Sequence, residues 1–337
     1  MSAEGSLNLE TEDLLVVQKK KKIVRTSERI KRRPVHGVLL LDKPNGMSSN
    51  DALQKAKWLL RAEKAGHTGT LDPLATGLLP LCFGAATKFS QLHLDADKRY
   101  DAIAALGVKT TTGDAEGDVL ERRDVNVSDE LLQSVLPQFR GEISQIPPMH
   151  SALKKDGKAL YEYARAGIEV ERLARNVTIF DLVGELYGDA AIKIIVKCSK
   201  GTYIRTLGED IGEKLGCGAH LSSLRRMGTG GFDVSQCVTL EALEAMTEDQ
   251  RLACLLPVES LLDEHVRVEL DAENTSRFLN GMSRRGSWPD SERVAVYGTL
   301  QAASTVVLLG VGRVVGGELM PNRLLSPSDI EQILDKS

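Results

Sequence analysis

The chain has 337 residues, of which 42% are hydrophobic and 27% are charged, a composition typical of a soluble globular enzyme with one large and one small domain. No run of eighteen apolar residues predicts a membrane-spanning helix, and the acidic first fifteen residues do not resemble a signal peptide. The five cysteines are scattered without a CxxC pair, which argues against a disulfide framework or a zinc site. We therefore expect a cytoplasmic protein whose thiols are small buried side chains.

The net charge of −4 is unevenly spread along the chain. Residues 19–33, KKKKIVRTSERIKRR, hold nine Lys or Arg and one Glu, so the rest of the chain has a net charge of −12. This run, without any sustained apolar period, predicts a flexible arm over residues 1–35. Two interpretations of the arm remain equally open: a tail that adds salt-dependent affinity for RNA, or a solvated leader without a specific role.

The folded part is predicted to begin at His36. Residues 37–44, GVLLLDKP, are typical of a buried strand that ends in a turn, and residues 48–63 have cap candidates before apolar residues at helical spacing. Residues 64–77 are rich in Gly, Thr and Pro and predict a loop. Farther along, we predict strands at residues 98–108, 176–187 and 190–198, the last two as a hairpin, and helices at residues 128–138, 158–167, 204–215 and 239–246.

Strands and helices alternate without a strict βαβ repeat, which predicts an α/β or α+β fold around a central mixed, largely antiparallel sheet. The composition shifts near residues 258–263. The remaining chain holds short apolar runs with Gly-rich turns, VRVEL, RVAVYG and STVVLLGVGRVVGGELMPNRLL, which is the pattern of a small β-barrel-like module.

The densest cluster of turn-forming residues is KAGHTGTLDPLATG, residues 64–77, which contains Asp72. Its three glycines permit tight backbone geometry, and Pro73 fixes the chain directly after Asp72. Such a loop suits a carboxylate that must be held in one direction. From composition alone, however, an Asp-Pro turn with local hydrogen bonds is the favoured interpretation.

Three further segments carry candidate functional side chains. Tyr203 and Arg205, in CSKGTYIRTL, are two positions apart, so in an extended segment they would point to the same side. An Arg beside a carboxylate would keep it ionised, and a Tyr could stack on a base. Asp97–Tyr100 sets two basic residues beside an aromatic ring, and residues 146–158 form a Pro-bounded loop with three lysines and a histidine. For each segment, a packed or solvated surface is the alternative interpretation.

Several common catalytic motifs are absent from the sequence. It has no GxxxxGK[ST] phosphate loop, no HExxH pair and no GxSxG elbow. The glycines of residues 310–318 do not follow the GxGxxG register, and none of the six histidines belongs to a metal-ligand cluster. We therefore expect neither a metal nor a coenzyme.

Taken together, these segments resemble the TruB family of pseudouridine synthases, in its stand-alone bacterial branch. The resemblance covers about residues 37–258 and rests on the ordered blocks LLLDKPNGMSSND, GHTGTLDPLATGLLPLCFGAATKFSQ, DKRYDAIAALG, IPPMHSALKKDGKALYEYARAGIEV, CSKGTYIRTLGEDIG and LGCGAHLSSLRRM. The tail resembles, more loosely, the PUA-like module that ends these enzymes. The resemblance implies a catalytic pseudouridine synthase domain over residues 36–260 and a PUA-like RNA-binding domain over residues 261–337.

The resemblance also implies an activity: isomerisation of uridine-55 in the T-loop of tRNA, by a monomer without cofactor or guide RNA. The implied catalytic residues are Asp72 as the essential carboxylate, Arg205 as its partner, Tyr100 as a base-stacking acid or base, and Tyr203 in the same pocket. The implied RNA-contacting residues are Lys43 and Pro44 supporting the Asp72 loop, His67 in the place of the flipped base, Leu224 lining the pocket, Lys88 on the RNA backbone, and Lys154 in a lid over residues 147–175.

Two features depart from the family pattern. His150 stands where many bacterial members carry Tyr, and the basic arm lies outside the usual sequence. Three alternative functions are also considered: a non-catalytic RNA-binding or RNA-folding protein on the same scaffold, a guide-dependent subunit like those of the dyskerin group, and a glycosidase. The third needs paired carboxylates, and only one carboxylate has a constrained setting here.

Overall fold

The structure, a computed structural model, describes residues 31–300 and 305–335, and the compact unit begins at Arg32. The predicted basic arm lies almost entirely outside the described residues. The helices of the described part are α1 (Ser49–Leu59), α2 (Ser90–Leu94), α3 (Asp129–Val135), α4 (Leu160–Arg165), α5 (Ile204–Lys214), α6 (Leu240–Ala245), α7 (Glu248–Ala253), α8 (Ala272–Leu279) and α9 (Pro327–Leu334). None of these helices is long and apolar enough to cross a membrane.

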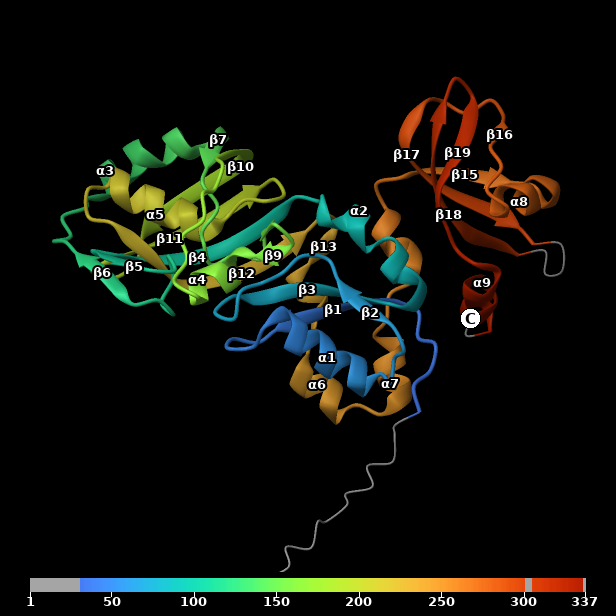
Figure 1. The fold of residues 1–337 in the computed structure, drawn as a ribbon, viewed down its shortest axis with the longest axis horizontal. Helices are drawn as coiled ribbons and strands as arrows, with labels where there is room; N and C mark the ends of the chain where they lie inside the picture. Colours follow the sequence, from blue (N-terminus) through green and yellow to red (C-terminus); the bar gives the residue numbers. More distant parts are fainter. Residues whose placement is uncertain (1–30, 301–304, 336–337) are drawn as a thin grey trace, which may run out of the picture. The chain divides into compact units, whose positions relative to one another are not determined.

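A mixed sheet forms the centre of the larger part of the fold (Figure 1). Within the described residues its strand order is β14-β1-β3-β12-β4-β11-β10-β7, with β2 added to β3 and β13 added to β12. Only the β14–β1 and β3–β12 neighbours are parallel. The strands are β1 (Gly37–Lys43), β2 (Ala65–His67), β3 (Thr76–Phe83), β4 (Lys98–Leu106), β7 (Gly141–Gln145), β10 (Arg175–Leu186), β11 (Ala191–Cys198), β12 (Ala219–Thr229), β13 (Phe232–Asp233) and β14 (Val238–Thr239).

Two groups of helices cover different parts of this sheet. Figure 1 shows α1, α6 and α7 together beside β1, whereas α3 and α5 lie near β10 and β12. Two small hairpins, β5 (Val108–Thr110) with β6 (Val119–Arg122) and β8 (Lys154–Lys155) with β9 (Lys158–Ala159), lie outside the large sheet.

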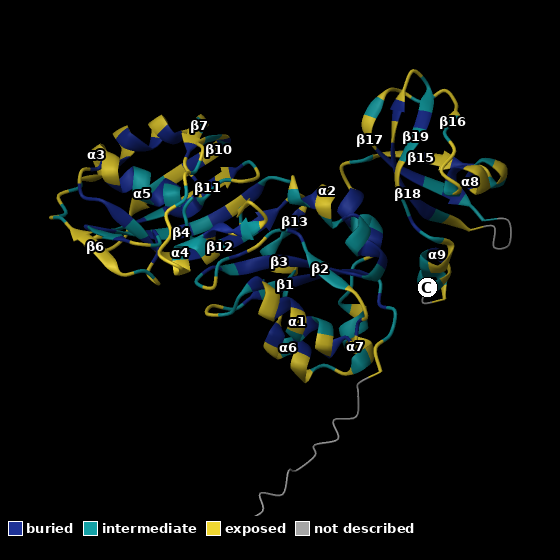
Figure 2. Ribbon diagram, in the orientation of Figure 1, coloured by how far each residue is buried: buried dark blue, intermediate teal, exposed yellow. Residues whose placement is uncertain are grey.

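The strands β1 and β3 are buried on both faces, and this explains their continuous apolar sequences. Leu39 and Leu41 pack in one core cluster with α1, while Val38 and Leu40 pack in a second cluster. The second cluster continues through the 3₁₀ turn Val258–Leu262 into the C-terminal sheet. Figure 2 shows these two strands in the colour of buried residues, in contrast to the outer strand β6.

The C-terminal part is a smaller five-stranded sheet with two helices. Its strands are β15 (Val266–Leu270), β16 (Arg284–Arg285), β17 (Ser291–Thr299), β18 (Val306–Val315) and β19 (Glu318–Leu324), in the order β15-β17-β18-β19-β16. The predicted strand-rich module is thus confirmed. The helices α8 and α9 were not predicted, although Asp271 and Ser326 cap them as such residues do.

Most elements predicted from the sequence are confirmed, including the 176–198 hairpin, seen as β10 and β11, and the helices α1, α3, α5 and α6. The predicted loop 64–77 is partly wrong, because its beginning forms β2 and pairs with β3. Two central strands, β3 and β12, were missed. In β12, register shifts after Leu221 and Arg226 interrupt the alternation that would have identified a strand.

Candidate active site

The loop that carries Asp72 runs from β2 to β3 and is tied to the start of α1. The buried Ser49 hydroxyl accepts a hydrogen bond from the Leu71 N–H at 2.7 Å and donates to the Leu71 carbonyl at 2.8 Å. On the other side, the Gly46 N–H donates to the Pro73 carbonyl at 2.9 Å. The backbone on both sides of Asp72 is therefore held by neighbouring elements.

Lys43 lies beneath this loop at the end of β1. It is fully buried, and its ammonium donates to the carbonyls of Pro44 at 2.8 Å, Met47 at 2.5 Å and Pro73 at 3.3 Å. Burial lowers the pKa of Lys43 to about 8, and the Asp72 carboxylate opposes this shift. One cation thus joins two loops at the base of the candidate site.

Arg205, in the first turn of α5, pairs with Asp72. Its Nη2 lies 3.0 Å from Asp72 Oδ2 and donates to the His150 carbonyl at 2.7 Å. Its Nη1 donates to the Thr112 carbonyl at 2.9 Å and lies 3.4 Å from Asp114 Oδ2. Because the guanidinium is held by four acceptors, it can fix the direction of the Asp72 carboxylate.

Two opposing influences act on Asp72. Burial raises the pKa of the carboxyl above its ordinary value, the charge of Arg205 is the largest influence that lowers it, and Asp114 raises it further. The side chain nevertheless keeps 37% of its surface exposed, and Asp72 lines two cavities. Asp72 is therefore an oriented carboxylate in a site that a substrate can reach.

The first cavity, of about 510 Å³, collects the catalytic residues that the resemblance implied. Asp72, Tyr100, Tyr203, Arg205 and Leu224 all line it. Tyr100 is 9% exposed, and burial raises the pKa of its hydroxyl. Residues from one loop, two strands and the start of a helix thus meet at one point, which sequence spacing could not show.

Tyr203 and Arg205 reach this cavity from the start of α5. The predicted helix over residues 204–215 is confirmed, since α5 begins at Ile204 with Tyr203 as its N-cap, so the two side chains do not share one extended segment. The Gln145 side chain fixes the cap: its Oε1 accepts from the Tyr203 N–H at 3.0 Å, and its Nε2 donates to the Tyr203 carbonyl at 3.3 Å. The Arg175 guanidinium lies 5.2 Å from the centre of the Tyr203 ring.

A second cavity, of about 420 Å³, also borders Asp72 and Arg205. His67, Glu116 and His150 line it. Burial and, secondarily, the charge of Arg226 lower the pKa of His67, which favours the neutral ring. The predicted RNA-contacting His67 is therefore close to the ion pair but not in the cavity that holds Tyr100.

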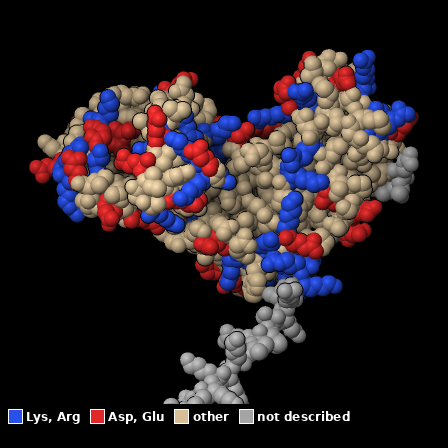
Figure 3. Space-filling model, in the orientation of Figure 1, with Lys and Arg blue, Asp and Glu red and all other residues tan. Residues whose placement is uncertain are grey.

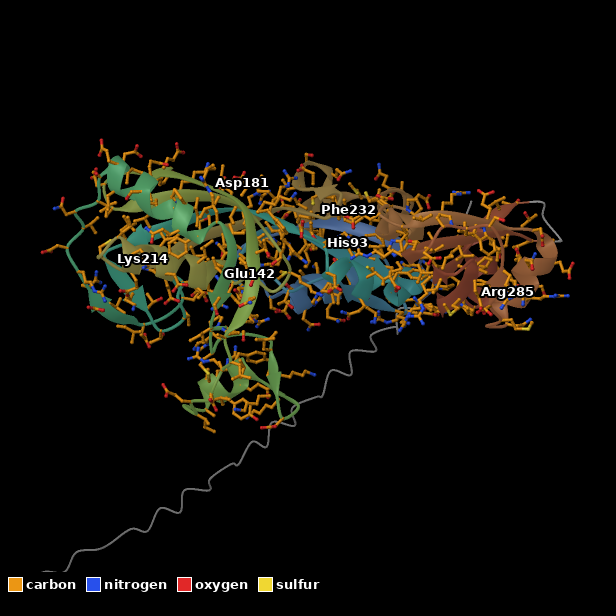
Figure 4. All side chains as sticks on the ribbon, turned by 90° about the horizontal axis from the view of Figure 1, so that it is seen from above. His93, Glu142, Asp181, Lys214, Phe232 and Arg285 are labelled. Atoms are coloured by element: carbon orange, nitrogen blue, oxygen red, sulfur yellow. The ribbon has the colours of Figure 1, made fainter. Side chains whose placement is uncertain are left out.

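The two remaining lysines named from the sequence lie outside both cavities. Lys88 makes a 2.8 Å salt bridge to Asp329 and donates to the Leu324 carbonyl at 3.1 Å. Lys154 is exposed on β8. In the view of Figure 4 the segment with β8, β9 and α4 stands away from the large sheet, below the label of Glu142 on β7. The roles implied for these lysines remain predictions.

The structure adds residues that sequence reasoning did not single out. Asp114 and Glu116 come from the loop after β5 and line the second cavity, whereas Arg175 and Arg226 line the first cavity. Lys98, from the predicted segment Asp97–Tyr100, also lines the first cavity. Arg226 was inside the quoted block LGCGAHLSSLRRM, but nothing in a pair of adjacent arginines tells which one is buried. The contact between α2 and β13 was likewise not anticipated: the rings of His93 on α2 and Phe232 on β13 have centroids 4.9 Å apart (Figure 4).

Charge distinguishes the cavity from the outer surface. Figure 3 shows acidic and basic side chains intermingled over the end of the molecule that carries α3 and β6. The first cavity, by contrast, is lined by one acidic residue, Asp72, and by four basic ones, Lys98, Arg175, Arg205 and Arg226. This balance suits an anionic ligand. Within the described ranges no group of three or more His, Cys, Asp or Glu could hold a metal ion.

Two family models match the chain. The model described as "TruB family pseudouridylate synthase (N terminal domain)" matches residues 57–204, and that described as "tRNA pseudouridylate synthase B C-terminal domain" matches residues 205–263. The proteins named "tRNA pseudouridine synthase B" of Verminephrobacter eiseniae and Ralstonia pickettii are 64% and 59% identical to the chain. These alignments cover 91% and 87% of the chain and 93% and 95% of the relatives.

Among solved structures, the one titled "Crystal Structure of a Cbf5-Nop10-Gar1 Complex" has a similar fold. It superposes with a TM-score of 0.65 at 26% identity, over 89% of this chain and 87% of that one. The predicted fold class is thereby confirmed. Given the high identity over nearly the whole chain and the site assembled around Asp72, the chain belongs to the TruB family of pseudouridylate synthases, and is therefore an isomerase.

Proposed function

We propose that the chain isomerises uridine-55 in the T-loop of tRNA to pseudouridine, without a guide RNA. The reaction breaks the bond from ribose C1′ to uracil N1, turns the base and joins C1′ to C5. It loses no atom and involves no net redox change, so it requires no coenzyme. A uridine stacked inside the folded loop must first be flipped out, at a cost of roughly a few kcal/mol.

The observation that carries this proposal is the Asp72 carboxylate, oriented by Arg205 at 3.0 Å, at a cavity that also holds Tyr100. The cavity of about 510 Å³ is within the size range of small-ligand sites, roughly 300–1,000 Å³. In this proposal Asp72 is the nucleophile or proton carrier, Tyr100 lies against the target base, and Leu224 lines its pocket. His67 fills the space that the flipped base leaves in the RNA.

The proposal extends to tRNA as the partner, since the relatives carry the name "tRNA pseudouridine synthase B". The exposed segment 147–175 acts as a lid that tRNA orders, with Lys154 near the RNA backbone. For Lys88 to contact a phosphate, the RNA must compete with Asp329. Residues 261–337 form the second RNA-binding domain, and a role in tRNA folding is compatible with the isomerase activity.

The decisive test is Asp72→Asn, assayed by pseudouridine mapping and tritium release from [5-³H]uridine in a bare T-arm stem-loop. We expect the variant to lose all measurable isomerisation, because the amide can neither attack nor carry the proton, while tRNA affinity stays within a few-fold. Asp124→Asn, at an exposed aspartate, is the matched control and should remain fully active.

Activity of the Asp72→Asn protein would contradict the assignment of the catalytic residue. A wild-type protein that modifies RNA only when a guide RNA is added would instead be a guide-dependent synthase. A protein that binds the stem-loop tightly but never modifies it would be a non-catalytic RNA-binding protein.

A further inference from the structure

Arg226 is a buried cation without an acidic partner in the described part of the chain. It is 1% exposed, and it is the largest of the fully buried side chains. Its neighbour on β12, Arg225, differs in both respects: it is partly exposed and forms a bidentate pair with Asp42 at 2.7 and 3.0 Å. A buried charge without an opposite charge destabilises the fold. Because Arg226 nevertheless lines the candidate active site, we expect it to have a function there.

The hydrogen bonds of Arg226 lead to the Asp72 loop. Its Nε donates to the Leu78 carbonyl at 2.7 Å, and its Nη2 donates to the Gly69 carbonyl at 3.3 Å. Gly69, with φ of +102°, is three residues before Asp72 in the loop between β2 and β3. Arg226 therefore connects β12 and β3 to the start of the catalytic loop.

Arg226 also contacts Tyr100. The two residues lie directly opposite each other in the β4–β12 ladder, and the Arg226 guanidinium is the largest influence that lowers the pKa of the Tyr100 hydroxyl. Both residues line the cavity of about 510 Å³. A single side chain thus touches the two groups, Tyr100 and the Asp72 loop, that the proposed reaction uses.

Building on the proposed function, we propose that Arg226 is a positioning residue for isomerisation: it holds the Tyr100 hydroxyl and the Gly69 end of the Asp72 loop, and it supplies positive charge beside them. Its role is clearest in the last step. There the C5–H bond of the re-attached base breaks, its electron pair forms the C5=C6 double bond, and the C6=N1 pair moves to N1, which takes a proton from water. The C5 proton passes to the ionised Tyr100 oxygen, which later releases it to water.

The charges around Tyr100 set the direction of the pH effect. Burial raises the pKa of Tyr100, Arg226 is the largest influence that lowers it, and Cys198 on β11 and Asp72 raise it. Lys98 on the same strand and Arg205 on α5 line the same cavity. Loss of the Arg226 charge should therefore raise the pKa of Tyr100, so a rate that needs the ionised hydroxyl rises only at higher pH.

The test compares R226K and R226M with R225K and R225M, using single-turnover tritium release, tRNA affinity and melting temperature. We expect R226M to slow the reaction by about 10- to 100-fold, with tRNA affinity within about threefold. Its rate should also rise at higher pH than that of the wild type. R226K keeps the charge but cannot make all three contacts, so it should be slower than wild type with a nearly unchanged pH profile. The Arg225 variants should stay within about threefold in rate.

A double-mutant cycle with Tyr100→Phe separates positioning from a purely structural role. Because Arg226 acts partly through Tyr100 and partly through the Asp72 loop, R226M should cost clearly less in the Tyr100→Phe protein than in the wild type. Losses that multiply, or an R226M rate and pH profile equal to those of the wild type, would overturn the inference. Should R226M fail to fold, the same cycle with R226K decides. The wild-type protein is assayed first, beside Asp72→Asn. If the wild type shows no isomerase activity, the proposed function itself is refuted, independently of the role of Arg226.

Discussion

The base of the candidate site and the segment that borders it differ in how they are built. At the base, Lys43 and Arg226 are almost fully buried, and each donates to backbone carbonyls of two or more segments. In the segment of residues 146–174, which contains nearly all of the lid proposed over residues 147–175, large apolar side chains are instead exposed, and Leu173 keeps 80% of its surface in contact with solvent. The base of the site is held by hydrogen bonds within the protein, whereas the 146–174 segment leaves apolar side chains exposed to solvent.

This difference separates two tasks. Groups that act on the reacting bonds must be held in place before the substrate arrives, because reorganisation during the reaction raises the barrier. A segment that closes over a large substrate needs low local stability in the free protein. Mutations at the base should therefore change stability and rate, whereas mutations in the 146–174 segment should change affinity alone.

The largest effect is expected from Arg205→Met. The substitution leaves the Asp72 and Asp114 carboxylates without their common partner, which should cost about 3–5 kcal/mol of unfolding free energy. Because Arg205 is the main influence that lowers the pKa of Asp72, this pKa should rise further. A higher pKa means less ionised Asp72 at a given pH, so the acid limb of the rate should move to higher pH.

Urea unfolding and single-turnover rates between pH 5 and 9 measure both effects of Arg205→Met. Arg140→Met is the control, since in the described part of the chain the Arg140 side chain donates to the Leu182 carbonyl alone and lines neither cavity. An Arg205→Met protein with the acid limb of the wild type would show that Asp72 titration does not limit the reaction.

A smaller effect is expected from Lys43→Ala, which removes the ammonium donor to the carbonyls of Pro44, Met47 and Pro73, of which Pro73 keeps the Gly46 N–H. Part of this loss is offset because a buried charge is removed, so we expect a net destabilisation of about 2 kcal/mol in urea unfolding. Lys55→Ala, which removes the exposed pair with Glu244 and the cation–π contact with the exposed Trp58 ring, should cost less than about 1 kcal/mol. Equal costs for the two variants would show that the base of the site is not held by Lys43.

The sequence predicts the fold well where periodicity is regular, as in α1 or in the hairpin of β10 and β11. It fails at β12, where two register shifts interrupt the alternation. The same strand carries Arg225 and Arg226, one paired at the surface and one buried at the cavity. Nothing in their sequence distinguishes them, because the face of a strand is decided by its register with β3 and β4.

The candidate site divides in a similar way. From composition alone Asp72 looked like part of a turn, and its importance depended on the resemblance of several separate blocks. Arg205 lies 3.0 Å from Asp72 because of the tertiary fold, and the positions of the two residues in the sequence do not predict this contact. Asp114, which shares Arg205, comes from a third segment and had no motif to mark it.

The smallest effect on stability, and the sharpest contrast, is expected from Leu173→Ser in the 146–174 segment. Because the side chain is 80% exposed in the free protein, unfolding free energy should change by less than about 0.5 kcal/mol. If tRNA covers this side chain on binding, its lost burial should weaken affinity by roughly 1 kcal/mol, or about fivefold. Leu120→Ser on β6, 65% exposed and lining neither cavity, is the matched control and should leave affinity unchanged.

Equal affinities of the two variants would mean that residues 146–174 do not close over the RNA. The base of the site and the 146–174 segment would then differ in burial but not in their roles in tRNA binding.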